Sequence, residues 1–152
     1  MKFMKKMREV KHGGASFWYT DNDVCEDIDI DDDVEELEID LDDDGDAFWD
    51  EVDKVFTNVK KIHINENVYY ISMKNSMFPN VRKVTSDSPE FYDGDMLIEE
   101  NDGTVLLNTF CKKAGEVINL DGIDMIAANA FNGCESINII NMKTRCWFIH
   151  YI

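Results

Sequence analysis

The sequence lacks paired cysteines and long apolar runs, and each absence excludes a class of protein. None of the four cysteines forms a CxxC pair, and the spacing of cysteines and histidines does not indicate a zinc site. Reduced thiols in a cytoplasmic protein are the simplest expectation. No stretch approaches the roughly 20 apolar residues of a membrane-spanning helix. Arg8, Glu9 and Lys11 interrupt the N-terminal stretch, which argues against a secretory signal.

Motifs of common catalytic sites are also missing. The chain has no phosphate-binding loop and no GxGxxG, GxSxG or HExxH pattern. His12, His63 and His150 have no recognisable nucleophile beside them. Carboxylates are abundant, but a catalytic pair needs two that lie in different environments of one cleft, which a sequence does not show. We therefore expect a protein that is not an enzyme and that has no cofactor.

Negative charge is what the chain has in excess, and it is concentrated in one segment. The net charge is −17 over 152 residues. Between Asp21 and Asp53 there are 19 acidic residues and no Lys or Arg, whereas the other 119 residues hold 13 acids and 15 bases. Such a field repels nucleic acid and anionic membranes, because both are negatively charged. It favours another protein with a basic surface as the partner, although simple solubility is the plainer explanation.

The acidic segment alternates apolar and charged residues in the manner of half-buried strands. Ile28 and Ile30, and later Leu37 and Ile39, are separated by acids, with a turn expected at residues 31–33. Like charges on one strand face lower stability, which favours a functional reason for them. The pattern predicts one solvent-facing set of acids for binding a basic partner: Asp27, Asp29, Asp31, Glu36, Glu38 and Asp40.

Calcium binding is an alternative role for the same segment. Four acids have the spacing of the oxygen ligands in an EF-hand loop: Asp40, Asp42, Asp44 and Glu51. Gly45 occupies the position of the sharp turn, and Asp46 can cap a following helix over residues 47–56. Against calcium, the preceding stretch alternates like a strand, and acids at 19 of 33 positions generate such a pattern easily by chance.

Internal repetition is the most informative feature of the rest of the chain. An apolar-x-x-apolar-x-x-apolar pattern in residues 56–64 recurs in residues 78–86 at an offset of 22 positions. Residues 134–142 carry a third copy, 56 positions further on, and residues 34–39 carry a weaker one, 25 positions before the first. A short strand with its return segment cannot bury an apolar face alone, so such units stack on one another. The offsets predict a solenoid of stacked strands.

One unit resembles a known family of repeats. Residues 117–137 contain Ala130-Phe131-x-Gly133-Cys134 followed by an apolar residue three positions on, and this looks like the BspA-type leucine-rich repeat. The resemblance extends over about residues 56–142. It implies that Cys134 and Phe131 are buried core residues. Members of the family are commonly adhesive proteins of the cell surface or secreted proteins.

The predicted fold class is α/β, mostly β: a short leucine-rich-repeat-like solenoid with an inserted β-hairpin and an acidic N-terminal segment. The basic first sixteen residues predict a short helix that ends at Gly13-Gly14. Turn signals at Asp93-Gly94 and Asp102-Gly103 predict the hairpin, which resembles an insertion of the same family. One domain is expected over residues 1–152, in these parts: cap or helix 1–20, acidic segment 21–53, repeats 54–145 with hairpin 88–110, and C-terminal strand 146–152.

Macromolecular recognition is the function that these patterns favour. The outward side chains of the repeat strands form the candidate binding face, and they are Glu36, Glu38, Asp40, Lys61, His63, Asn65, Lys83, Thr85, Ile139 and Asn141. We expect a non-catalytic protein-interaction module. The first alternative is an acidic mimic of nucleic acid that inhibits a nucleic-acid-acting protein, as immunity or anti-defence proteins do. The second is a calcium-binding module.

Overall fold

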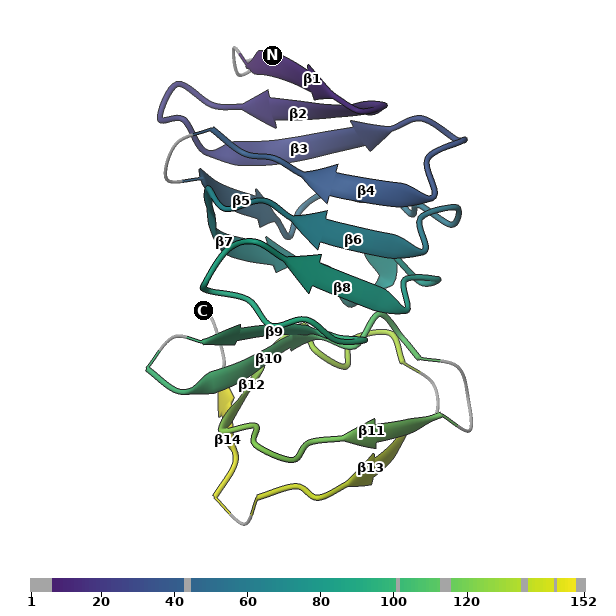
Figure 1. Cartoon of the computed structure of the whole chain (residues 1–152), viewed down its shortest axis with the longest axis vertical. Helices are drawn as coiled ribbons and strands as arrows, with labels where there is room; N and C mark the ends of the chain where they lie inside the picture. The colour runs from purple at the N-terminus through teal and green to yellow at the C-terminus, as the bar shows by residue number, and fades with distance from the viewer. Residues whose placement is uncertain are drawn as a thin grey trace, which may run out of the picture.

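The chain folds into a β-solenoid of about five turns (Figure 1), with 46% strand and 2% helix. This computed structural model describes residues 7–42, 45–100, 102–112, 116–134, 137–143 and 145–149. Within these ranges no helix is long and apolar enough to cross a membrane. The elements are β1 (Arg8–His12), β2 (Ala15–Tyr19), β3 (Cys25–Ile30), β4 (Glu36–Ile39), β5 (Gly45–Trp49), β6 (Lys61–Ile64), β7 (Val68–Met73), the 3-10 helix η1 (Asn75–Met77), β8 (Lys83–Ser86), β9 (Leu97–Glu100), β10 (Thr104–Asn108), β11 (Val117–Asn119), β12 (Met125–Ala127), β13 (Asn138–Ile140) and β14 (Trp147–Ile149).

Parallel pairing between successive turns builds the solenoid. One sheet has the order β1-β2-β3-β5-β7 and a second has the order β4-β6-β8, so the chain alternates between them at every half turn. After β8 the arrangement resumes in a β14-β12-β10-β9 sheet and a separate β11-β13 sheet. In Figure 1 the strands β4, β6 and β8 are stacked along the long axis, and β11 and β13 lie beyond the hairpin.

Strand register confirms the sequence repeat and extends it. Lys61 pairs with Lys83 at the predicted offset of 22, and Glu36 pairs with Lys61 at the offset of 25 that marked the weakest copy. Cys25 pairs with Ala47 in the other sheet, so the acidic segment forms a turn of the solenoid and does not lie outside the repeat. The third copy forms β13, which pairs with β11 and not with the β4-β6-β8 sheet.

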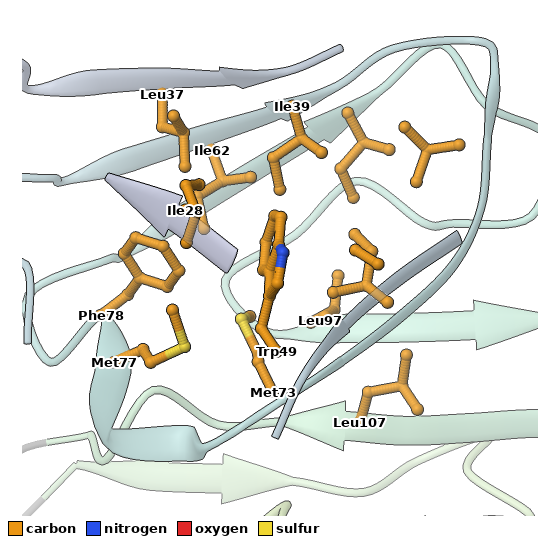
Figure 2. Close-up of a cluster of buried hydrophobic side chains, with 14 of the residues drawn as sticks. Ile28, Leu37, Ile39, Trp49, Ile62, Met73, Met77, Phe78, Leu97 and Leu107 are labelled. Atoms are coloured by element: carbon orange, nitrogen blue, oxygen red, sulfur yellow. The ribbon is translucent and has the colours of Figure 1, made fainter. Parts of the chain in front are cut away.

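The core lies between the two sheets of the first three turns. Ile28 from one sheet and Leu37, Ile39 and Ile62 from the other surround Trp49, as Figure 2 shows. All five side chains are almost completely excluded from solvent. Full burial of a large apolar side chain contributes about 1.5–3 kcal/mol. The inward-facing side chains of each strand therefore hold the turns together, and the outward-facing side chains are available for other roles.

Two predicted helices are wrong in the residues that the structure describes, which exclude residues 1–6 of the first. Residues 8–19 form the antiparallel hairpin β1–β2, because Gly13 and Gly14 both have positive φ (54° and 80°) and make a two-residue turn, not a helix C-terminus. Residues 45–49 form β5, which pairs in parallel with β7. Burial alternates along β5, and the pairing of this strand with its neighbouring turn outweighs the helical spacing of its apolar residues.

The two ends of the solenoid differ. At the first end, the aromatic residues 17–19 belong to β2, and the side chains of Phe17 and Tyr19 are buried. At the other end, residues 147–149 of the predicted C-terminal strand form β14, and residues 150–152 lie outside the described residues; Trp147 is 70% exposed and Phe148 is 55% exposed. Trp147 and Phe148 therefore do not close the core at this end.

The inserted hairpin is confirmed, with one difference. β9 and β10 pair in antiparallel fashion on either side of the Asp102-Gly103 turn, where both residues have positive φ. β10 also pairs in parallel with β12, so it is at the same time the first strand of the fourth solenoid turn. The hairpin therefore connects the first three turns of the solenoid to the last two and is part of the solenoid.

Glu99 of this hairpin gives the fold a specific pH dependence. Its side chain is only 4% exposed, and burial, helped by the charge of Glu90, raises its pKa from 4.5 to about 7. Below about pH 4.5 both folded and unfolded states are protonated at Glu99, whereas near pH 7 and above the folded state must hold a buried carboxylate. We expect Glu99→Gln to be progressively more stable than the wild type as pH rises from 4.5 to 8, by on the order of 2 kcal/mol at the upper end.

Urea unfolding of both proteins at several pH values measures this difference. Glu66→Gln, a change of the same kind at an exposed position, is the matched control and should follow the wild type at every pH. A constant difference between Glu99→Gln and the wild type from pH 4.5 to 8 would contradict the assignment.

Candidate functional site: the outer face of the β4-β6-β8 sheet

The solvent side of the β4-β6-β8 sheet, here called the outer face, gathers most of the predicted partner-binding residues. Leu37, Ile39 and Ile62 point into the core, so the residues between them point outward. The parallel register aligns these outward side chains in rows that run across the three strands. The first row is Glu36, Lys61 and Lys83, and the second row is Glu38, His63 and Thr85.

The second row is fixed by hydrogen bonds between side chains. His63 Nδ1 lies 2.7 Å from Thr85 Oγ1, and His63 Nε2 lies 2.9 Å from a carboxylate oxygen of Asp87. Asn65 donates from Nδ2 to Glu38 Oε1 at 3.2 Å. Both ring nitrogens of His63 are therefore engaged, which fixes the orientation of the ring. The side chains of this row are therefore preorganised, and they face solvent in fixed positions.

His12 adds a further contact to this row from outside the sheet. The β1–β2 hairpin places His12 Nε2 3.0 Å from Glu38 Oε2 and His12 Nδ1 3.7 Å from Asp40 Oδ2. The hydrogen bond to Glu38, followed by the charges of Glu38 and Asp40, raises the pKa of His12 above its usual 6.5. More of His12 is therefore protonated near neutral pH than in an isolated side chain. In its protonated form, His12 offsets part of the acidic charge at the first turn.

The same three side chains are the group whose chemistry suits a metal ion. Donor atoms of His12, Glu38 and Asp40 all lie within 4.8 Å of one another. All three side chains are partly exposed, and both carboxylates already contact the imidazole ring. Ion pairing accounts for their proximity without a metal.

The first row differs from the second because its charged side chains are not held by contacts with other described side chains. In the part of the chain that the structure describes, Glu36, Lys61 and Lys83 make no ion pair or side-chain hydrogen bond with another residue. Glu36 and Lys83 are exposed, and Lys61 is half-buried. An acid followed by two bases across about 10 Å of sheet is a charge pattern that another molecule can match.

The remaining predicted acids lie elsewhere. Asp27 and Asp29 belong to β3 in the other sheet, where the Lys54 ammonium contacts both carboxylates at 3.1 and 2.9 Å. Asp31 lies in the turn that leads from β3 toward β4. The prediction that six acids share one face is therefore wrong, because the chain changes sheets between Ile30 and Glu36. Glu36, Glu38 and Asp40 lie on the side of the second sheet, and Asp27 and Asp29 lie on the first.

The described part of the proposed calcium loop does not have the required geometry. β5 is extended from Gly45 to Trp49, a rise of about 13 Å, and it separates Glu51 from the acids that precede the strand. Asp42 is paired with the Arg8 guanidinium at 2.7 Å, and Asp40 contacts His12. Asp44 lies outside the described residues. The calcium prediction is wrong for Asp40, Asp42 and Glu51, because an EF-hand ligand set needs a tight loop where this chain has a strand.

Sequence reasoning missed two residues of the outer face, His12 and Asp87. Asp87 lies 22 positions after Asn65, so the repeat offset could have placed it beside that residue. His12 has no such signal, because its contact depends on the β1–β2 hairpin folding over the edge of the first turn. The predicted outward residues Ile139 and Asn141 are exposed, but they lie at the β11-β13 sheet, away from this face.

Comparison of the chain with protein-family models, with curated proteins and with solved structures finds no match. The resemblance of residues 117–137 to BspA-type repeats therefore stays a prediction. The strand pairing alone defines the solenoid.

Proposed function

We propose that the chain is a non-catalytic protein-interaction module that binds another protein through the outer face. One observation carries this proposal. The charged side chains of the first row, Glu36, Lys61 and Lys83, make no ion pair with a described residue, and they lie beside a second row whose side chains are fixed by hydrogen bonds. Binding through fixed side chains loses little conformational entropy, and unpaired charges are available to a partner. A leucine-rich-repeat-like solenoid is a scaffold suited to this use.

The charge pattern indicates what kind of surface the partner has. Glu36 and Glu38 on β4, with Asp40 directly after it, form the acidic end of the outer face, and the turn at residues 31–33 leads into this edge strand. A basic surface fits this end, and one or two acidic groups fit opposite Lys61 and Lys83. Electrostatic matching of this kind raises the association rate and makes it sensitive to salt.

Charge reversal of the first row tests the proposal. We expect the combined change Glu36→Lys, Lys61→Glu and Lys83→Glu to weaken binding to the partner by at least about tenfold, because three complementary contacts become repulsive. The partner is first identified by affinity capture from the native host, with wild-type and variant baits quantified side by side. Its affinity for each bait is then measured by calorimetry with the purified protein.

The matched control changes acids of the other sheet. Asp27→Asn with Asp29→Asn alters charge to a similar degree without touching the outer face, and this variant should bind like the wild type. Equal binding by the first-row variant and the wild type would overturn the assignment of the outer face.

A second candidate function is inhibition of a nucleic-acid-acting protein by acidic mimicry. The observation that favours it is the placement of the 21–53 segment: many of its acids lie on β3, on β4 and in the turn between these strands, so one end of the molecule is acidic on several sides. Neutralising Asp29, Asp31, Glu38 and Asp40 together should abolish binding, and a DNA or RNA duplex should compete with the chain for the partner. Binding that survives these four changes contradicts mimicry.

A further inference from the structure

Two cysteines that are far apart in sequence lie in contact in the second half of the solenoid. Cys111 follows β10 and Cys134 follows β12, and their sulfur atoms are 3.3 Å apart. Both side chains are partly buried, so each is reachable by a small molecule. This arrangement differs from the prediction that Cys134 is a fully buried core residue. Phe131 is likewise only partly buried at the edge of the second core cluster.

A buried asparagine holds the two thiols in this position. Asn75 of η1 is 1% exposed, and its Nδ2 group lies 3.1 Å from Cys111 Sγ and 3.0 Å from Cys134 Sγ. Its Oδ1 atom accepts hydrogen bonds from the backbone N–H groups of Thr109 (2.9 Å) and Phe110 (2.7 Å). One side chain therefore fixes both the thiols and the backbone that leads into Cys111.

The backbone around the thiols is also constrained. Phe110 and Cys111 have positive φ values of 56° and 47°, a conformation that non-glycine residues adopt only when their surroundings impose it. Gly133, with φ of 77°, lies beside Cys111, since a Cβ atom there would be in ordinary van der Waals contact with Cys111 Sγ, 3.9 Å away. The two sulfur atoms meet because three separate turns of the solenoid place them together.

We propose that Cys111 and Cys134 are a site of reversible oxidation, at which a small-molecule disulfide such as oxidised glutathione converts the two thiols to a disulfide that links the fourth and fifth turns. A disulfide bond is about 2.0 Å long, so the two sulfur atoms must approach by little more than 1 Å to form it. Cys25 is distinct, because it is fully buried and accepts a hydrogen bond from Trp49 Nε1 at 3.4 Å.

The exchange proceeds in two balanced steps. The exchange begins when one of the two thiols, here taken as Cys134, loses its proton, because the thiolate is the nucleophile. Its thiolate bonds to one sulfur of oxidised glutathione and displaces one glutathione thiolate, which leaves a mixed disulfide. Cys111 then loses its proton, attacks Cys134 Sγ and displaces the second glutathione. Two protein thiols are oxidised, and one glutathione disulfide is reduced to two thiols.

Incubation of the full chain with oxidised glutathione tests the proposal. We expect peptide mapping without reduction to recover a Cys111–Cys134 cross-link, and the melting temperature to rise by roughly 5–10 °C, because the bond closes a long loop of the unfolded chain. Dithiothreitol should reverse both changes. Cys146→Ser keeps the pair intact and should show the same cross-link and the same shift.

Single variants separate this pair from unspecific oxidation. Cys111→Ser should stop at the mixed disulfide, with glutathione retained on Cys134, and should show no comparable rise in melting temperature. The proposal is overturned if Cys111 and Cys134 of the wild type remain separately alkylatable after oxidation. It is also overturned if the cross-links join other cysteines or two different chains.

Discussion

Replacement of Trp49 by alanine is expected to lower the free energy of unfolding by about 3–5 kcal/mol. The indole is completely buried between the two sheets, stacks on Phe17 with ring centroids 6.4 Å apart, and donates a hydrogen bond to Cys25 Sγ. Figure 2 shows it surrounded by core side chains from both sheets. Truncation removes these contacts and leaves a large cavity that the strand ladders cannot close. Urea unfolding followed by circular dichroism measures the loss.

An exposed tryptophan of the same chain provides the matched control. Trp147 is 70% exposed on the edge strand β14, so Trp147→Ala removes the same atoms with little lost burial and should change stability by less than about 1 kcal/mol. Similar losses for the two variants would contradict the assignment of Trp49 as the centre of the core.

Replacement of Asn75 by alanine is expected to lower the free energy of unfolding by about 2–4 kcal/mol. The change leaves the backbone N–H groups of Thr109 and Phe110 without their acceptor, and removal of a partner from a buried donor costs about 1–3 kcal/mol for each group. Urea unfolding measures the loss. Because Asn75 also contacts both thiols, the variant should form the Cys111–Cys134 cross-link more slowly than the wild type under the same oxidant.

Asn119→Ala is the control for this prediction. Asn119 is exposed on β11, and its side-chain oxygen accepts hydrogen bonds from the Asp121 backbone and from Asn141 Nδ2. Loss of these solvent-exposed bonds should lower stability by less than about 1 kcal/mol. An Asn75→Ala protein with the unfolding curve of the wild type would show that the buried network does not stabilise the fold.

Alternation and repeat offset were sufficient to predict the solenoid. The apolar residues Leu37 and Ile39 point inward at every second position, and the offset of 22 residues between Lys61 and Lys83 is the register of the sheet. Both signals follow directly from the geometry of stacked parallel strands, in which each turn repeats the previous one. For the same reason, the outward residues His63, Lys83 and Thr85 were placed correctly on one face.

Features that depend on contacts between distant segments were not predictable in this way. The spacing of Phe48, Val52 and Val55 fits a helix, but pairing with β7 makes residues 45–49 a strand. Gly13-Gly14 is compatible with the end of a helix or with a hairpin, and only packing of Phe17 into the core decides between them. The acids of residues 27–40 alternate continuously in sequence, yet the turn at residues 31–33 sends them to two sheets.

The interruption of the second sheet after β8 sets the size of the contact that the outer face can make. Three strands of four residues cover about 14 Å by 13 Å, on the order of 200 Å². A stable protein–protein interface buries about 800 Å² on each partner. A partner that binds tightly must therefore reach past the outer face, onto the acidic turn at residues 31–33 on one side or onto the segment at Gly94, which pairs with Val84, on the other. A partner confined to the three strands would bind briefly, as in a transient encounter.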